Sequence, residues 1–215
     1  MTIWTADSPM RVAVLASGGG SNLQALLDST SPPAPARVVL VMSDRPDAGA
    51  LKRARLAGVP TVALEDPASA PEILDALHGA GADLVVLAGY LKLVPAEVVR
   101  VHAGRIINIH PALLPAFGGP GMYGLRVHQA VLSAGATVTG ATVHHVIEEY
   151  DRGPIIAQWP VRVEPGDTPE SLAARVLQVE HRLLPAVVLA AARAGRVVRL
   201  MPQADFGMPG LTGEA

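Results

Sequence analysis

The sequence predicts one α/β domain with a Rossmann-like open sheet, mostly parallel, with helices on both faces and an antiparallel extension after residue 135. Short β-rich runs alternate with Ala/Leu-rich stretches, which is the pattern of repeated βαβ units. The short runs are apolar on both faces, as strands covered by helices on both sides must be. Half of the 215 residues are hydrophobic and only 3% are aromatic, so we expect an aliphatic core.

The first half of the chain contains the expected parallel strands and their crossover helices. The strands are predicted at residues 12–16, 38–42, 61–64, 84–88 and 106–109. The helices are predicted at residues 22–28, 48–57, 71–78 and 95–102. Pro95 suits the first position of its helix because the proline ring fixes φ near the helical value.

The alternation changes after residue 109. A loop rich in Pro and Gly at residues 111–124 precedes a helix at residues 127–133. Two longer strands, at residues 137–146 and 155–163, are predicted to add a hairpin to the parallel sheet.

The last predicted helix spans residues 168–194 and has an apolar stripe at helical spacing. Pro185 is expected to kink or divide it. We predict a flexible N-terminal extension at residues 1–10, a single domain at residues 11–200 and a mobile C-terminal tail at residues 201–215.

Composition excludes several classes of protein. The 17 Lys and Arg residues nearly balance the 19 Asp and Glu residues, and no block of like charge occurs, so we expect no nucleic-acid partner. No apolar run approaches the roughly 20 residues of a membrane span, which predicts no membrane association. The absence of cysteine excludes a thiolate zinc site and suits a reducing cytoplasm. The histidines form no metal-binding motif, so we expect no metal.

A glycine-rich segment, residues 17–22 (SGGGSN), joins the first strand to the first helix. Free N–H groups at a helix start favour an anion, which predicts a phosphate ligand. Ser21 and Asn22 could contact that ligand or cap the helix, and a tight turn without a ligand is the alternative. Leu23 replaces the third glycine of a dinucleotide fingerprint, which weakens that interpretation, although Asp44 follows at the expected distance.

A second group of polar residues lies at the end of the fifth predicted strand. Asn108 and His110 alternate along it and so share one side, at the edge of the sheet where open α/β folds bind ligands. An amide donor beside an imidazole suits stabilisation of an oxyanion in acyl transfer, and the imidazole could also deliver a proton. Asp151, in a turn between two later strands, could orient His110 and hold it charged. The alternative is that these residues only cap loops.

Six segments occur together in the order typical of one family. They are SGGGSNLQ, VVLAGYLKLVP, INIHPALLP, GATVHHV, EEYDRGPIIAQ and VEHRLLP. Over residues 11–199 the chain resembles the phosphoribosylglycinamide formyltransferase family of folate-dependent formyltransferases. The resemblance implies formyl transfer from 10-formyltetrahydrofolate, acting as a co-substrate, to the amine of glycinamide ribonucleotide in purine (IMP) synthesis. It leaves open whether two copies form a homodimer.

The resemblance also assigns residues. Its catalytic trio falls on Asn108, His110 and Asp151, which would stabilise a tetrahedral intermediate and assist proton transfer. The residues assigned to substrates are Gly20, Ser21, Asn22 and Glu180 for the ribonucleotide, and Leu91, Lys92, Leu93, Val94 and Asn108 for the folate. Thr142 and His144 match inward-facing residues of secondary importance.

Some segments depart from the family pattern. The loop at residues 117–126 is longer, the segment after the third strand lacks a basic folate contact, and Lys92 stands where Arg is frequent. The alternatives are a formyltetrahydrofolate enzyme with another acceptor (methionyl-tRNA, an amino sugar or water), a non-catalytic binding module, and a dinucleotide-dependent oxidoreductase.

Overall fold

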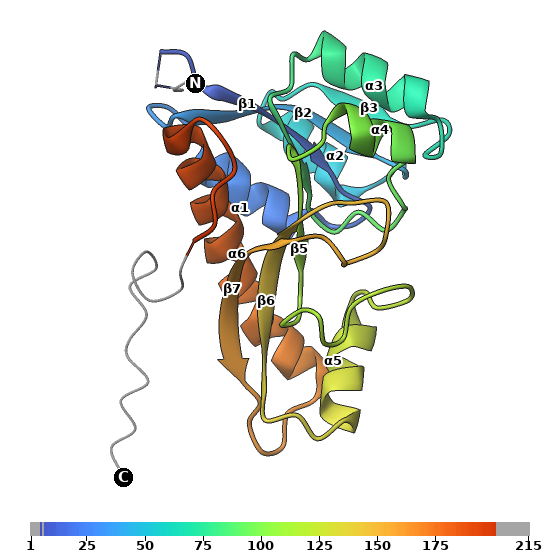
Figure 1. The fold of residues 1–215 in the computed structure, drawn as a ribbon, viewed down its shortest axis with the longest axis vertical. Coiled ribbons are helices and arrows are strands. Elements are labelled where there is room, and N and C mark those ends of the chain that lie inside the picture. Colours follow the sequence, from blue (N-terminus) through green and yellow to red (C-terminus); the bar gives the residue numbers. More distant parts are fainter. Residues whose placement is uncertain (1–4, 6, 201–215) are drawn as a thin grey trace.

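The computed structural model describes residue 5 and residues 7–200, and a seven-stranded sheet lies at its centre (Figure 1). The strands are β1 (Met10–Leu15), β2 (Ala36–Ser43), β3 (Thr61–Ala63), β4 (Leu84–Leu87), β5 (Ile106–His110), β6 (Val138–His145) and β7 (Ile155–Arg162). Their order across the sheet is β3-β2-β1-β4-β5-β6-β7. β1 to β5 pair in parallel, whereas β6 and β7 are antiparallel, which confirms the mostly parallel sheet with an antiparallel extension.

Six helices of the described residues surround this sheet. They are α1 (Ser21–Ser29), α2 (Gly49–Leu56), α3 (Ala70–Gly79), α4 (Ala96–Val101), α5 (Leu125–Ser133) and α6 (Pro169–Ala194). None of them is both long and apolar enough to cross a membrane.

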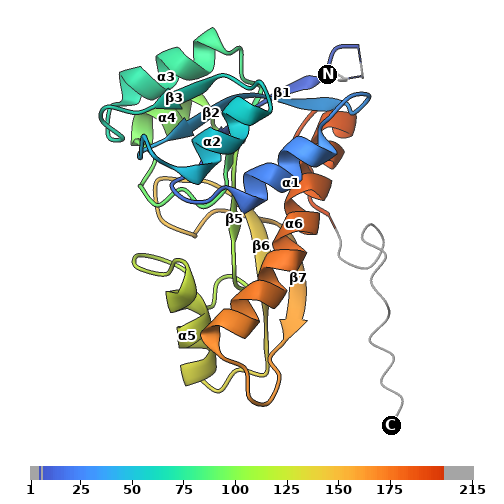
Figure 2. The same cartoon turned by 180° about the vertical axis from the view of Figure 1, so that it is seen from behind.

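Both faces of the sheet are covered because its strands are apolar on both sides. On one face, Val12 and Val14 of β1 pack with α1, α2, α5 and α6. On the other, Ala13 and Leu15 pack with α3 and α4. Figure 2 shows α1 and α6 side by side, on the side of the sheet opposite α3 and α4. Two aliphatic cores thus hold the strand ends of the parallel half in fixed positions.

The predicted elements are confirmed, with boundaries shifted by one or two residues at most ends. Pro95 is an exception, because it caps α4 from outside with an extended ψ of 138° and is not its first helical residue. Pro185 is another, because α6 runs undivided through it. Leu184 and Val188 beside it are buried against the sheet, so packing holds the helix together where one backbone hydrogen bond is missing.

The described residues include the start of the predicted domain but only part of the segments expected on either side of it. Met10 is buried and begins β1. Residues 1–4, 6 and 201–215 lie outside the described residues, so the expected flexible extension and mobile tail stay predictions.

Candidate active site

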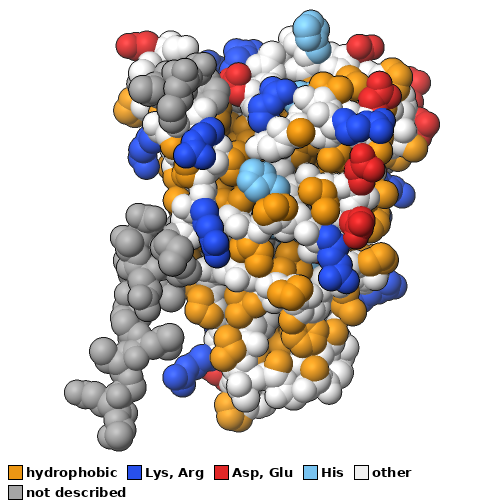
Figure 3. Space-filling model, in the orientation of Figure 1, with side chains coloured by type: hydrophobic (Ala, Val, Ile, Leu, Met, Phe, Trp, Pro, Cys, Tyr) orange, Lys and Arg blue, Asp and Glu red, His pale blue; other side chains and the backbone are white. Residues whose placement is uncertain are grey.

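A cavity of about 660 Å³ opens at the carboxyl ends of β4 and β5. Its walls come from the segments 89–94, 108–111, 119–125, 146–151 and 173–180. In the sheet, β1 connects to β2 on one side and lies against β4 on the other, and ligands of open α/β folds bind at such a reversal. The space-filling view shows hydrophobic side chains gathered over the lower half of the molecule, and most charged ones above (Figure 3).

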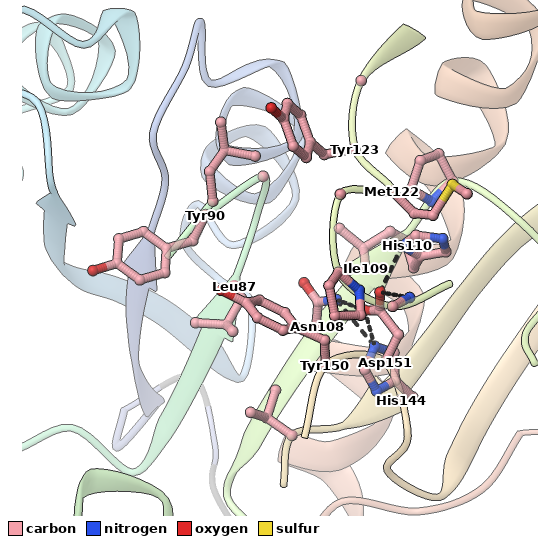
Figure 4. Close-up of a pocket in the computed structure, with 18 of the residues that line it drawn as sticks. Leu87, Tyr90, Asn108, Ile109, His110, Met122, Tyr123, His144, Tyr150 and Asp151 are labelled. Carbon is pink, nitrogen blue, oxygen red and sulfur yellow. Dashed lines mark hydrogen bonds and ion pairs between the residues drawn. The ribbon is translucent and has the colours of Figure 1, made fainter. Parts of the chain in front are cut away.

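Asn108 and His110 point into this cavity from β5 (Figure 4). Alternation along the strand places both side chains on one side, as predicted. Antiparallel pairing places β6 beside them, with His144 opposite Asn108 and Thr142 opposite His110. The change from parallel to antiparallel pairing at β5 therefore adds a second set of side chains to the site.

Asp151 completes the group from the loop between β6 and β7. Its Oδ1 accepts a hydrogen bond from Asn108 Nδ2 at 3.4 Å, and its Oδ2 lies 3.6 Å from His110 Nδ1. The backbone N–H of Gly119 donates to Oδ2 at 2.8 Å. Asp151 has a left-handed φ of 54°, and this tight turn needs Gly153, where an added Cβ would lie 1.7 Å from His145 O.

His144 lies beside both Asn108 and Asp151. Its Nδ1 lies 2.8 Å from His145 O, and because a carbonyl only accepts, that nitrogen carries a proton. The opposite nitrogen, Nε2, lies 3.0 Å from Asn108 Nδ2 and 3.5 Å from Asp151 Oδ1. His144 thus helps to fix the orientation of the Asn108 amide.

Both ring nitrogens of His110 face protein groups. Nε2 lies 2.8 Å from Phe117 O and donates to it, while Nδ1 faces Asp151. Burial lowers the pKa of His110 below 6.5, and this outweighs the opposing effects of the Asp151 charge and the Phe117 carbonyl. The expectation that Asp151 holds His110 charged therefore does not describe this state, in which burial favours the neutral imidazole.

In Asp151, the effects of neighbouring groups on the pKa outweigh the effect of burial. Burial raises its pKa, but the hydrogen bond with His144, the charge of His110 and the Gly119 N–H together lower it below 3.8. The site therefore contains a fixed negative charge beside a histidine that can gain a proton.

Asn22 and Glu180 lie in another part of the same cavity. Asn22 Nδ2 donates to Glu180 Oε2 at 2.7 Å, although 158 residues separate them. Glu180 is only 7% exposed, so it lies on the buried side of α6. Burial raises its pKa to about 7, while the Asn22 hydrogen bond acts in the opposite direction.

The glycine loop approaches this region at the start of α1. Gly20 is the N-cap, with φ 76°, and no side chain caps the helix. Ser21 is therefore the first helical residue and not the cap, and it faces a second hollow on the outside of α1. The loop residues Gly20 and Ser21 do not line the large cavity, whereas Asn22 does.

The residues assigned to the folate all line the large cavity. Leu91, Lys92 and Leu93 are exposed at its mouth and Val94 is buried. The N–H of Leu91 donates to Ser17 Oγ at 2.9 Å, so this loop is tied to the start of the glycine loop.

Sequence reasoning did not assign a role to several residues that shape the site. Ser17 could have been found from its place at the end of a buried strand, and His128 lines the cavity from α5. Phe117 and Gly119 act through backbone atoms, which side-chain identity does not reveal. Thr142, expected to face inward, is buried opposite His110 and holds the loop after β5 by accepting from Leu114 N and donating to Ala112 O.

The acid-base and amide groups of the site suit acyl transfer. A carboxylate that lies 3.4 Å from an amide and 3.6 Å from a histidine forms with them a group that can stabilise an oxyanion and move a proton. Within the described residues, no group of three or more His, Cys, Asp or Glu side chains is placed to hold a metal ion.

Comparison with known proteins adds a family to this geometry. The model of the Formyl transferase family matches residues 10–188. A chloroplastic phosphoribosylglycinamide formyltransferase of Arabidopsis thaliana is 48% identical over 186 residues, and the match covers 83% of this chain and 64% of that protein. The phosphoribosylglycinamide formyltransferase of Mycobacterium tuberculosis is 45% identical, with 89% of each chain covered. The crystal structure of phosphoribosylglycinamide formyltransferase from Anaplasma phagocytophilum has a TM-score of 0.82 at 35% identity, covering 92% of this chain and 96% of that one.

Proposed function

This chain belongs to the formyl transferase family, and we propose that it transfers the formyl group of 10-formyltetrahydrofolate to the amine of glycinamide ribonucleotide, a step of purine synthesis. The names of the similar proteins support the acceptor. The observation that carries the chemistry is the convergence of Asn108, His110 and Asp151 in one cavity, which the bonded pair Asn22 and Glu180 also lines.

We assign the two substrates to opposite parts of the cavity. The apolar mouth around Leu91 and Leu93 suits an aromatic pterin, which gains from burial of its rings. The Asn22–Glu180 pair offers a hydrogen-bond acceptor to the hydroxyls or the amine of the ribonucleotide. This places the reacting amine and the formyl carbon between them, beside Asn108.

The proposed reaction begins when the amine attacks the formyl carbon. The carbonyl oxygen becomes negative in the tetrahedral intermediate. The two N–H groups of Asn108 face His144 and Asp151 in this structure, so one of them must turn from its partner to donate a hydrogen bond to this oxygen. The new negative charge favours the charged form of His110, whose burial otherwise keeps it neutral. Protonation of His110 thus becomes favourable at the step that needs a cation.

Proton transfer completes the reaction. The attacking nitrogen loses one proton and the leaving folate nitrogen gains one, so no net proton is consumed. We propose that His110, oriented by Asp151, carries this proton. His110 Nε2 donates to Phe117 O in this structure, so that carbonyl must give way before the ring can donate to a substrate.

A coupled assay tests the function directly. The purified protein is mixed with 10-formyltetrahydrofolate, and the folate product is followed by absorbance with and without glycinamide ribonucleotide. Deformylation that requires the ribonucleotide supports the proposal. Deformylation without it indicates a hydrolase, and no reaction in either mixture indicates a binding module; both results contradict the proposal.

The remaining expectations stay proposals as well. The partners that we propose are the two small molecules, and the proposed location is the cytoplasm. Donor and acceptor both bind as substrates, and we assign no residue to a metal.

A further inference from the structure

Helix α2 supports the glycine loop from behind. The N–H of Ala50 donates to Gly18 O at 3.0 Å, and a Cβ added at Gly20 would lie 2.7 Å from Ala50 Cα. A Cβ added at Gly49 would likewise lie 3.0 Å from Gly19 Cα. The loop and the helix therefore touch through their backbones, which only small residues allow.

Arg53 extends this support by one helical turn. Its Nε donates to Gly19 O at 2.8 Å, and its Nη1 donates to Gln24 Oε1 at 3.1 Å. Gln24 in turn donates from Nε2 to Asp28 Oδ1 at 2.9 Å, which fixes its amide so that the oxygen faces Arg53. The guanidinium thus joins the glycine loop to the first turn of α1, and α1 and α2 are in contact (Figure 2).

The position of this guanidinium suits an anion. The carbonyl of Gly19 would present a partial negative charge near the start of α1, and the Arg53 hydrogen bond occupies it. No described residue accepts a hydrogen bond from Arg53 Nη2, so that nitrogen remains free to donate to a ligand.

The first turn of α1, beside Arg53, has no side-chain cap and no acidic residue to offset its positive end. Asn22, in the same turn, is 92% buried, and its Oδ1 has no hydrogen-bond partner among the described residues although it lines the cavity. An amide oxygen buried without a partner calls for a donor from a ligand, such as a ribose hydroxyl or an amine, on the cavity side of the helix start, whereas Arg53 lies on the side of the second hollow.

The described lining of the neighbouring hollow carries one positive charge, on Arg53, and one negative charge, on Asp28. Ser21, Gln24, Asp28, Arg53 and His181 are among the described residues that line it. Burial lowers the pKa of His181, so that ring is neutral at pH 7, and Arg53 is the only lining side chain with a positive charge there. Asp28 offsets part of that charge, but it lies two helical turns into α1, bonded to Gln24.

We propose that Arg53 is a specificity-determining residue that makes the protein prefer a phosphorylated acceptor. It acts in two ways, by holding the glycine loop in an anion-binding shape and by adding a positive charge next to it. The inference rests on the proposed function, because the phosphate in question belongs to the proposed ribonucleotide.

The test compares two acceptors in matched variants. The kcat and KM for glycinamide ribonucleotide and for the dephosphorylated riboside are measured in the wild type, Arg53→Gln and Arg53→Lys. Arg55→Gln is the control, because it removes one charge from the same helix. The wild-type Arg55 side chain donates to Thr61 Oγ1 and makes no hydrogen bond to the described residues of the glycine loop. Titration with inorganic phosphate gives a second measurement that does not need turnover.

In Arg53→Gln we expect the ribonucleotide KM to rise roughly tenfold, the typical scale of a lost charge-assisted hydrogen bond. The folate KM, kcat and the riboside kcat/KM should stay the same. The ribonucleotide KM of Arg53→Lys should fall between those of the wild type and Arg53→Gln, because lysine keeps the charge but loses the planar fork of the guanidinium. The phosphate Kd should rise in the same order, and Arg55→Gln should match the wild type.

Three results separate failure of the inference from failure of the proposed function. An unchanged ribonucleotide KM and phosphate Kd in Arg53→Gln would overturn the inference alone. Equal losses with both acceptors would also overturn it, since they indicate a general structural role. If the wild type transfers no formyl group to either acceptor, the proposed function fails, and the phosphate Kd series still decides whether Arg53 serves an anion. If Arg53→Gln does not fold, Arg53→Lys is compared in its place.

Discussion

Single residues of the site differ in how well the sequence predicts them. The Asn-x-His spacing was enough to place Asn108 and His110 together, because alternation in a strand is a local rule. Asp151 joins them at 3.4 and 3.6 Å only through tertiary structure, so its place in a turn between two strands made it a candidate and the family resemblance then supported that candidate. The Gly119 N–H and Phe117 carbonyl could not be predicted, since any residue type supplies those atoms.

Asn108→Ala tests the proposed oxyanion donor. Loss of one such donor typically lowers turnover by about 10² to 10³. We expect kcat to fall by that factor while the unfolding temperature changes little, because Asn108 is only partly buried. The measurement is steady-state kinetics together with thermal unfolding, and Gln129→Ala, an exposed amide bonded to Ser133, is the control. Wild-type turnover in Asn108→Ala would remove this residue from the mechanism.

Glu180→Gln tests the buried carboxyl. The folded pKa is about 7 against 4.5 for the ordinary group, so the folded state binds more protons between these values and loses stability as pH rises through them. A neutral glutamine avoids this cost, and the variant should be more stable by up to about 3 kcal/mol at pH 8 and nearly unchanged at pH 4.5. Urea unfolding at both values measures this. A variant less stable than the wild type at pH 8 would contradict the buried-charge account.

At the level of elements, helices and strands were predicted well because their hydrophobic patterns are long and consistent. The failures come from long-range packing. Pro185 is a helix breaker by its local chemistry, yet α6 continues through it because Leu184 and Val188 are buried against the sheet. Ser21 looked like a helix cap, but Gly20 adopts the left-handed φ that the close approach of α2 requires.

Gly153→Ala tests the turn that carries Asp151. A Cβ there would lie 1.7 Å from His145 O, so the backbone between β6 and β7 must move. We expect a loss of several kcal/mol in unfolding free energy, since steric overlap of this size cannot be absorbed by a rotamer change. Gly79→Ala, with nothing within 4 Å, should instead be neutral or slightly stabilising. Urea unfolding of both variants measures the difference, and equal stabilities would contradict the steric argument.

The whole molecule combines several histidines that burial keeps neutral. Burial lowers the pKa of five described histidines, which are His102, His110, His128, His145 and His181. The unfolded chain binds more protons than the folded one just below pH 6.5, so stability that is present above this pH is lost as pH falls through it. Glu180 acts in the opposite direction.

Acid sensitivity is therefore a property of the molecule that can be measured. We expect the free energy of unfolding to fall between pH 7 and pH 5.5, because five histidines outnumber one carboxyl. The fall should be steeper in Glu180→Gln, which lacks the opposing contribution. Urea titrations at four pH values measure both slopes. A flat profile in the wild type and the variant would show that the histidines are solvated in the folded state.

The hydrogen bond between Asn22 and Glu180 has a consequence for how the protein is made. A ribosome releases the glycine loop and the parallel strands first, whereas α6 is the last of the described helices to emerge. Until then, the apolar face of the sheet that α6 covers is open to solvent, and Asn22 has no Glu180 to bind. A nascent chain paused before residue 169 should therefore attract chaperones and bind no acceptor, and the binding site appears only once α6 has emerged.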